Sequence, residues 1–368
     1  MPSYNEAANI GKMIETLFSE EFLKIKNADM HLLVVDDNSP DGTGDVVKKN
    51  QKKYKNLHLL TGEKQGLGMA YVRGMKYAMN TLHADATIEM DADFQHNPVY
   101  VKDLVDAFVD GEADYVIGSR YVKGGSIPKT WAWHRRAVSF WGNLFARIVL
   151  FLPKLHDVTT GFRLTKVKGV LDKIELDHLM ELRRFAFKVD LFYQSVNLSQ
   201  KTVEVPIAFG TRKEEKSKFS LKEMVSTYKV VLLLRLRASQ KFVKFGIVGF
   251  VGFLINALAL SFFSNLLFPE AVSWALSTEL AIISNFTLNN LWTFRAEKIE
   301  GMLHLIKKFV QFNLTSSGAL VIQTVLGALM VRFFGDYRTI FLLIIVILVV
   351  MPYNYFMYNY FIWKNKKK

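Results

Sequence analysis

The chain has 368 residues, which leaves room for a catalytic domain and a second part. Lysine and arginine total 47 against 34 aspartate and glutamate, so the net charge is +13. Much of this excess flanks apolar segments, which favours anionic lipid headgroups over nucleic acid as partners. The absence of cysteine excludes disulfides and thiolate chemistry. Residues 1–6 have neither the basic start nor the apolar core of a secretory signal.

Up to about residue 240 the sequence is an ordinary mixture of strand-like and helix-like stretches. Short apolar runs predict strands at 31–35, 56–60, 86–90 and 115–118. Helical patterns extend from 66 to 79 and from 99 to 109. Strands that alternate with helices predict an α/β layer with a mostly parallel, right-handed sheet. A nucleotide-binding architecture is therefore expected.

Two stretches combine apolar and basic side chains at helical spacing. Residues 132–152 interleave aromatic side chains with arginine, and residues 219–240 end in Arg235 and Arg237. Both patterns fit amphipathic helices that lie in the headgroup layer of a membrane. For 132–152 a helix in the core of the soluble domain is the alternative, and the sequence alone leaves both interpretations open.

Beyond about residue 240, long apolar stretches dominate the sequence. A bilayer crossing needs about 20 largely apolar residues, and four stretches meet this condition. They lie near 243–267, 271–294, 309–334 and 339–363. Four buried helices of a soluble bundle are the alternative, but such helices normally keep a polar face.

The four apolar segments repeat in pairs. Residues 241–245 recur as 308–312, and residues 285–292 recur as 354–361. Two helical hairpins in tandem are therefore expected to pack as one four-helix membrane unit.

The basic residues predict an orientation in the membrane. Positive charge precedes the first segment and fills the loop 295–308 and the tail 364–368, whereas 268–270 contains no basic residue. The positive-inside rule then predicts a multi-pass cell-membrane protein whose termini and soluble domain are cytoplasmic. Arg332 and Arg338, on the opposite side, are an exception to this pattern.

The motif that says most about chemistry is Asp91-Ala92-Asp93, followed by Gln95 and His96, at the end of the strand 86–90. Two carboxylates one residue apart can hold Mg²⁺ or Mn²⁺ against a diphosphate, because hard cations take oxygen ligands that substrate phosphates complete. The carboxyl edge of an open α/β sheet is also where ligands bind. Alone the motif is weak, since acidic loops are common.

Several motifs occur together and in order, at 2–6, 36–43, 91–93, 118–121, 157–163 and 212–218. In combination they resemble the polyprenyl-phosphate glycosyltransferases of glycosyltransferase family 2, and most of all the dolichyl-phosphate mannose synthases. The repeated membrane unit resembles GtrA-like domains. The resemblance implies a Rossmann-like GT-A catalytic domain that binds nucleotide sugars over 1–218. An amphipathic linker over 219–241 and an all-α domain of four transmembrane helices over 242–368 would follow.

The resemblance also implies roles for single residues. The metal ligands would be Asp91, Asp93 and Gln95. The lipid phosphate of the acceptor would be held by Arg120, Arg135 and Ser139, with Arg136 able to substitute for its neighbour. Catalysis would depend on Asp91, Asp93 and Arg120. The nucleotide sugar would contact Pro2, Tyr4, Glu6, Val35, Asp37, Asp91, Ala92, Asp93, Arg120, Arg212 and Lys218. Asp36 and Asp41 fit turn-forming roles instead.

The implied reaction moves mannose from GDP-mannose to dolichyl or another polyprenyl phosphate with Mg²⁺ or Mn²⁺ as cofactor. A lipid phosphate is already ionised near neutral pH, so positioning matters more than proton transfer. One in-line displacement with inversion, and no covalent enzyme intermediate, is expected. The enzymatic alternative uses UDP-glucose and undecaprenyl phosphate. An alternative of another class is a flippase for lipid-linked sugars with a docking domain.

Two departures from the family pattern affect these expectations. The family carries an apolar strand directly before the motif at 2–6, and this chain starts at that motif. A missing central strand is expected to weaken the nucleotide site. Lys216 stands where relatives often carry glycine before Ser217 and Lys218.

Overall fold

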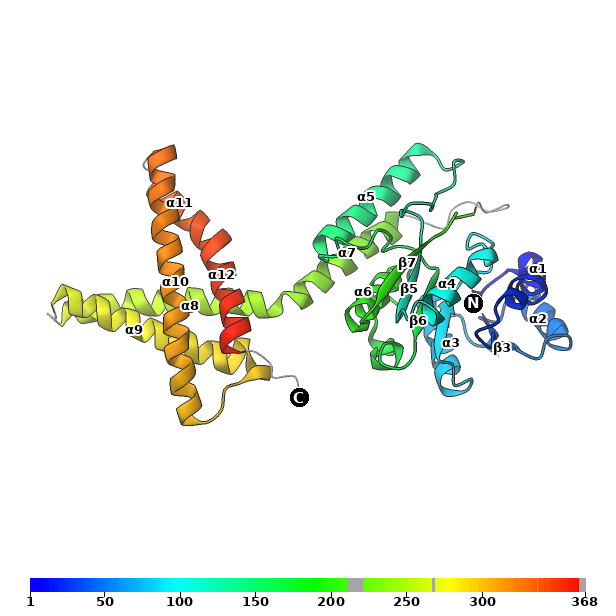
Figure 1. The fold of residues 1–368 in the computed structure, drawn as a ribbon, viewed down its shortest axis with the longest axis horizontal. Coiled ribbons are helices and arrows are strands. Elements are labelled where there is room, and N and C mark those ends of the chain that lie inside the picture. The colour runs from blue at the N-terminus through cyan, green and yellow to red at the C-terminus, as the bar shows by residue number, and fades with distance from the viewer. Residues whose placement is uncertain (211–220, 267–268, 336, 364–368) are drawn as a thin grey trace. The chain divides into compact units, whose positions relative to one another are not determined.

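A computed structural model describes residues 1–210, 221–266, 269–335 and 337–363 (Figure 1). Contacts within the chain divide it into two compact units, Met1–Arg235 and Leu236–Lys368. Each unit has hydrophobic clusters of its own, which is what a chain of two separately packed parts requires.

The strands of the first unit form two sheets. One is a parallel sheet of order β1-β2-β3, and the other has the order β4-β6-β5-β7. The strands are β1 (Pro2–Ser3), β2 (Leu32–Asp36), β3 (Leu57–Thr61), β4 (Ala86–Glu89), β5 (Tyr115–Ser119), β6 (Arg163–Lys166) and β7 (Thr202–Pro206).

Helices cover both faces of these sheets (Figure 1). The longer ones are α1 (Ala7–Thr16), α2 (Thr43–Gln51), α3 (Leu67–Asn80), α4 (Val101–Val109), α5 (Trp133–Val149), α6 (Phe187–Leu198) and α7 (Leu221–Ala238). Short helical turns are η1 (Leu17–Glu21), η2 (Phe22–Lys24), η3 (Pro98–Tyr100), η4 (Leu171–Lys173) and η5 (Leu176–His178).

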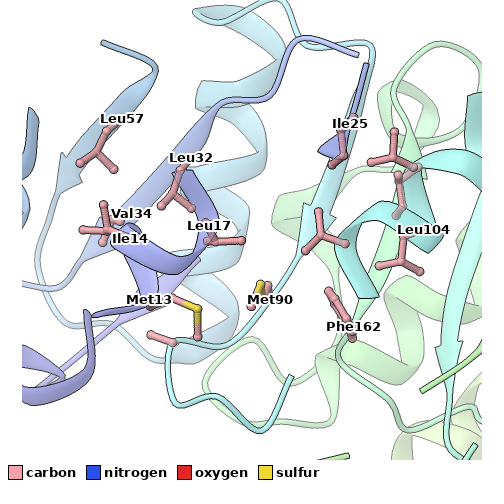
Figure 2. Close-up of a cluster of buried hydrophobic side chains, with 14 of the residues drawn as sticks. Met13, Ile14, Leu17, Ile25, Leu32, Val34, Leu57, Met90, Leu104 and Phe162 are labelled. Atoms are coloured by element: carbon pink, nitrogen blue, oxygen red, sulfur yellow. The ribbon is translucent and has the colours of Figure 1, made fainter. Parts of the chain in front are cut away.

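The side chains of β5 show how the core is divided. Val116 belongs to the cluster that packs β2 and β3 against α1 and α4, part of which is drawn in Figure 2. Tyr115 and Ile117 belong to a second cluster with α5, α6 and α7. This alternation follows from the pleat, since successive strand side chains point to opposite faces. A third cluster packs α3 against α6, so the sheet is enclosed between helical layers.

The sequence predicted four of these strands, namely β2, β3, β4 and β5, and the α/β layer is confirmed. The expected mostly parallel pairing holds for β1-β2, β2-β3 and β5-β7, but β6 runs antiparallel between β4 and β5. The sequence of β6, Arg-Leu-Thr-Lys, is too short and polar to register as an apolar run. Its pairing depends on contacts between residues far apart in the chain.

A cavity lies between β2 and β4. β1 pairs with Val35 and Asp36 only, and no ladder joins β2 to β4 in the part of the chain that the structure describes. The cavity has a volume of about 560 Å³ and is lined by residues of both strands together with η1, η2, α3 and α4. The effect expected from a further apolar strand ahead of β1 stays a prediction.

The second unit consists of two helical hairpins (Figure 1). The first hairpin contains α8 (Gln240–Asn265), α9 (Glu270–Leu288) and the π-helical turn η6 (Asn289–Thr293), and η7 (Arg295–Glu297) follows. The second contains α10 (Met302–Phe334), α11 (Arg338–Ile345), η8 (Val346–Val350), α12 (Met351–Met357) and the π-helical turn η9 (Tyr358–Ile362).

Aromatic contacts between the hairpins follow the sequence repeat. Phe286 of the first hairpin packs on Phe309 and Phe312 of the second, with ring centroids 5.3 and 5.5 Å apart. Its counterpart Tyr355 packs on the two phenylalanines within 242–245, which are the counterparts of Phe309 and Phe312. An aromatic ring near the end of each hairpin therefore packs on the matching pair of phenylalanines of the other hairpin, as in a symmetric dimer.

The ends of the hairpins repeat in the same way. Both π-helical turns, η6 and η9, occupy matching positions in the two halves. The residues that follow them, Phe294 and Trp363, are repeat counterparts and stack on each other with centroids 4.6 Å apart and planes at 7°. The duplication expected from the sequence is confirmed by these contacts.

Two described helices are long and apolar enough to cross a membrane, Gln240–Asn265 with a mean hydropathy of 2.1 and Met302–Phe334 with 1.7. A shorter apolar stretch covers Val346–Ile362. They overlap the first, third and fourth expected spans, and α9 overlaps the second. The crossing of a bilayer by all four segments stays a prediction.

Filling the cavity between β2 and β4 should stabilise the first unit. A fusion of about five apolar residues ahead of Met1 is expected to pair with β2 and fill this cavity. The thermal unfolding temperature of the extended chain should be higher than that of the parent. A polar extension of equal length is the control, and equal unfolding temperatures for both extensions would contradict the strand-like filling.

Candidate active site

The Asp-x-Asp motif forms a tight turn directly after β4. Ala92 is buried in the core cluster, which anchors the turn between its two carboxylates. Phe94 has a φ of 61°, a left-handed conformation that non-glycine residues rarely adopt, and it bends the chain back on itself. Such strained residues concentrate at functional sites, where surrounding structure holds them in place.

Two buried side chains donate hydrogen bonds to Asp91 from the interior of the unit. The Tyr71 hydroxyl of α3 donates to Asp91 Oδ1 at 2.8 Å, and the Lys188 ammonium of α6 donates to the same oxygen at 3.4 Å. Lys188 is completely buried, and an added Cβ at Gly161 would lie only 2.3 Å from its Nζ. A side chain at 161 would therefore displace the ammonium. One oxygen of Asp91 is committed inward, which leaves Oδ2 for a ligand.

His96 supports the same turn from the other side. Its Nδ1 accepts a hydrogen bond from the Asp91 backbone N–H at 3.0 Å, which places the ring proton on Nε2. Its ring is buried and stacks on Phe162 with centroids 5.2 Å apart. Burial lowers the pKa of His96 to about 4 despite the nearby Asp91 charge. The imidazole is thus a neutral acceptor that fixes the backbone of the motif.

The Lys188 charge keeps Asp91 ionised. Burial alone would raise its pKa, but the Lys188 ammonium, together with the Tyr71 hydrogen bond, holds the pKa of Asp91 well below its ordinary value. The carboxylate form of Asp91 is therefore present at any pH near neutrality.

Asp93 and Gln95 complete the predicted metal ligands on the same turn. Asp93 is buried, and its Oδ1 accepts the Gln95 backbone N–H at 3.1 Å. Carboxylate and amide oxygens are the donors that Mg²⁺ and Mn²⁺ take, with substrate phosphates supplying further ligands. No cluster of three or more His, Asp or Glu side chains suited to a metal occurs among the described residues. The donor set thus fits a cation shared with a diphosphate.

The residues expected at the nucleotide lie at the carboxyl ends of β1 and β2. Pro2 pairs with Val35 across the two strands. The Tyr4 ring lies beneath the Lys64 ammonium, 3.4 Å from the ring centroid. Asp37 Oδ1 accepts a hydrogen bond from Arg73 of α3, a partner that the sequence did not indicate.

Other polar residues of this region form local hydrogen bonds, and the nucleotide contact expected of Glu6 stays a prediction. Glu6 accepts a hydrogen bond from the Asn9 side chain and donates its backbone N–H to Thr43 Oγ1. Asp36 accepts the Ser39 hydroxyl, and Asp41 accepts Thr43 groups as well as the backbone N–H of Ala7. The turn-forming interpretation of Asp36 and Asp41 is thus confirmed. Arg212 and Lys218 lie outside the described residues.

Arg120 follows β5 and is built into a buried ion pair. Its Nε and Nη2 each lie 2.7 Å from the Asp157 carboxylate, and Nη2 also donates to Thr159 Oγ1 at 2.8 Å. Asp157 is completely buried and Arg120 is 8% exposed. Burial opposes both charges, yet the pKa of Asp157 is lowered and that of Arg120 raised because each stabilises the other. Among the described residues Nη1 has no hydrogen-bond partner, so it is available to an anion.

The other acceptor candidates lie on α5. The Ser139 hydroxyl is 2.6 Å from the Tyr121 hydroxyl, one residue after Arg120 in the chain. Asn143 of α5 bonds to both the Ser139 carbonyl and Thr159 Oγ1, at 3.0 Å each. This network ties α5 to the Arg120 pair.

Arg135 stacks on Trp131, with its guanidinium carbon 3.9 Å from the ring centroid. Burial and the charge of Arg120 lower the pKa of Arg135. Arginine binds phosphate oxygens through paired hydrogen bonds, and the role of these two arginines at the lipid phosphate stays a prediction.

The outer face of α5 is exposed although its inner face is buried. Trp133 and Trp141 are 79% and 61% exposed, whereas Ala146 and Leu150 pack in the core with α7. The buried face confirms that this helix packs in the core of the first unit. The interfacial interpretation, in which the exposed aromatic side chains lie among lipid headgroups, stays a prediction.

Sequence reasoning missed the residues that support the site from within. Lys188, Tyr71, Arg73 and Asp157 received no role, although Asp157 lay within a recognised motif. A lysine inside the apolar run 185–192 was a usable signal, because an unpaired lysine is almost never fully buried. No local pattern marked Arg73 or Tyr71, whose partners are distant in sequence.

The Arg120–Asp157 pair is expected to be costly to break. Asp157→Asn leaves a buried guanidinium without its counter-charge and should lower the free energy of unfolding by about 3 kcal/mol. Denaturant unfolding of the purified chain measures this. The matched control is Asp177→Asn, which removes the exposed Asp177–Lys76 pair and should cost less than about 1 kcal/mol. Equal losses for the two variants would contradict the assignment of a buried ion pair.

Each of the two units contains a match to the model of a known family. Residues 1–172 match the model of glycosyl transferase family 2, and residues 244–363 match that of the GtrA/DPMS transmembrane domain. The expected GT-A catalytic domain and the all-α membrane domain are confirmed by these matches together with the two units of the fold.

Curated relatives extend over most of the chain. A dolichol-phosphate mannosyltransferase from Pyrococcus furiosus is 32% identical over 314 residues, 84% of each chain. A polyprenol monophosphomannose synthase from Mycolicibacterium smegmatis is 35% identical over 60% of this chain and 79% of its own. An undecaprenyl-phosphate mannosyltransferase from Micrococcus luteus is 36% identical over 60% of this chain and 86% of its own. The chain therefore belongs to the polyprenyl-phosphate glycosyltransferases of glycosyltransferase family 2 and carries a GtrA/DPMS transmembrane domain.

Proposed function

We propose that this protein transfers mannose from GDP-mannose to dolichyl or another polyprenyl phosphate. The observation that carries the proposal is the pairing of two centres of opposite charge in one unit. One is the turn with Asp91 and Asp93, and the other is the arginine pair Arg120 and Arg135. Three relatives named for mannosyl transfer to prenyl phosphates support the sugar and the acceptor class. The guanosine base rests on the family resemblance.

The anionic centre serves the donor. Asp91 Oδ2, Asp93 and Gln95 would hold Mg²⁺ or Mn²⁺ against the donor diphosphate. The cation would neutralise the negative charge that grows on the departing nucleotide diphosphate. Tyr4, Asp37 and the β1–β2 edge would hold the nucleoside, with Arg212 and Lys218 on the phosphates.

The cationic centre serves the acceptor. Arg120, Arg135 and Ser139 would hold the lipid phosphate so that one of its oxygens attacks the anomeric carbon of the sugar. As the new bond forms, the bond to the diphosphate breaks, and the configuration inverts. A phosphate anion needs no base, and His96 is buried, neutral and hydrogen-bonded to backbone, so it is not assigned a proton transfer. Catalysis then comes from positioning and charge stabilisation.

The membrane supplies the acceptor. In this proposal residues 1–218 form the catalytic domain, 219–241 a linking amphipathic helix and 242–368 a membrane domain that crosses the bilayer four times. The exposed aromatic face of α5 would lie at the headgroup layer. Positive residues flanking the spans support a cytoplasmic catalytic domain and cytoplasmic termini.

A direct assay tests the proposal. The purified full chain in lipid nanodiscs, with Mn²⁺, is expected to convert dolichyl phosphate to a mannosyl lipid with GDP-mannose and not to a glucosyl lipid with UDP-glucose. Asp91→Asn and Asp93→Asn should each reduce the rate at least about 100-fold, because each removes charge that stabilises the departing diphosphate. Chelation of the metal should have a similar effect.

The control for this assay is Asp45→Asn, at a surface carboxylate with 82% side-chain exposure that should leave the rate unchanged. Preference for UDP-glucose with undecaprenyl phosphate would replace the proposal by its enzymatic alternative. A mannosylated protein side chain, trapped with donor alone, would exclude direct displacement.

A further inference from the structure

The two charged centres belong to different elements of the fold, and something must fix the distance between them. Asp91 follows β4, Arg120 follows β5, and Arg135 lies on α5. None of these elements by itself connects the metal turn to the arginine pair. The chain segment 207–210, which follows β7, contacts both.

The backbone of this segment is fastened on both sides. Beside Arg120, the Ile207 carbonyl accepts a hydrogen bond from the Ser126 N–H at 2.9 Å. The N–H groups of Ile207 and Phe209 donate to the carbonyls of Ser119 and Ser126, at 3.0 Å each. At its far end the Gly210 N–H donates to the Gln95 carbonyl at 2.8 Å, within the metal turn. An added Cβ at Gly210 would lie 2.6 Å from the Phe94 carbonyl oxygen. Glycine is therefore required for this close approach.

The ring of Phe209 makes the corresponding side-chain contacts. It meets His96 edge-on, with centroids 5.6 Å apart and planes at 72°. The Arg120 guanidinium carbon lies 5.3 Å from its centroid, and the Trp131 ring meets it edge-on at 5.8 Å. Trp131 in turn carries Arg135 at 3.9 Å. Both acceptor arginines therefore rest on Phe209, one directly and one through Trp131.

These contacts are of a kind that restricts motion. Cation–π contacts attract a guanidinium to the face of a ring, and edge-on aromatic pairs have preferred geometry. A leucine of similar bulk would fill the space without offering a ring face. The arginines would then keep their charge but lose the surface that orients them.

We propose that Phe209 is a positioning residue that sets the acceptor arginines against the metal turn. This inference rests on the proposed function, because it assigns Arg120 and Arg135 to the lipid phosphate. Loss of the ring should act mainly on the acceptor side. The donor side keeps its other supports, since Asp91 is still held by Tyr71 and Lys188 and His96 still stacks on Phe162.

The experiment measures the binding of farnesyl phosphate and of Mn²⁺ to the purified full chain. Phe209→Leu is expected to weaken binding of farnesyl phosphate, followed by ³¹P NMR, at least about 10-fold, since small displacements of oriented groups have large effects. Mn²⁺ affinity, followed by electron paramagnetic resonance, should stay within about two-fold of the parent. Phe209→Tyr keeps the ring and should bind farnesyl phosphate like the parent.

Two further variants separate positioning from folding. Trp131→Leu removes the second ring and should reproduce the acceptor defect. Gly210→Ala should instead weaken Mn²⁺ binding, because its Cβ displaces the turn that carries Gln95. Phe18→Leu is the matched control, since Phe18 stacks on Tyr54 away from both centres.

The outcomes distinguish this inference from the proposed function. Unchanged farnesyl phosphate binding in both Phe209→Leu and Trp131→Leu would overturn the positioning role. Equal losses of farnesyl phosphate and Mn²⁺ in these variants would also overturn it, because they indicate general disorder of the unit. If the parent binds farnesyl phosphate but transfers no mannose, the proposed function fails while the binding comparison still decides the role of Phe209.

Discussion

The site depends on one ion pair, that of the buried Lys188 ammonium with the partly exposed Asp91 carboxylate. A fully buried lysine is stable only with a partner, and Asp91 with the Tyr71 hydroxyl provides it. The same contact turns one carboxylate oxygen inward and keeps the group ionised. Gly161 leaves the space that the ammonium needs. The buried Lys188 ammonium thus fixes the orientation and the ionised state of the carboxylate to which we assign the metal.

The acceptor side repeats this arrangement with the signs reversed. There the buried group is the Asp157 carboxylate, and Arg120 is the partner that reaches the surface of the site. In both centres a completely buried charged side chain, Lys188 or Asp157, orients a more exposed partner of opposite charge. Buried pairs of this kind contribute little net stability, but losing one partner is costly, so they favour a single geometry over an ensemble. A reaction that relies on positioning needs such preorganisation.

Local patterns predicted the parts of the fold that local forces determine. The strand before Asp91, the amphipathic helices α5 and α7 and the hairpin repeat all follow from residue periodicity. The partners of the site residues could not be predicted, because Tyr71, Lys188 and Arg73 come from helices distant in sequence. β6 was missed for the same reason, since a four-residue polar strand is defined by its two neighbours.

The stacking of Phe294 on Trp363 has a consequence for the history of the membrane unit. Because the aromatic contacts of Phe286 and Tyr355 are mirrored between the hairpins, an ancestral gene encoding a single hairpin would produce a similar bundle by pairing two identical copies. Fusion of the copies would let each half diverge. Trp363 shows such a divergence. Its indole N–H donates a hydrogen bond to Asn290 at 2.9 Å, whereas its repeat counterpart Phe294 has no N–H in its side chain to donate.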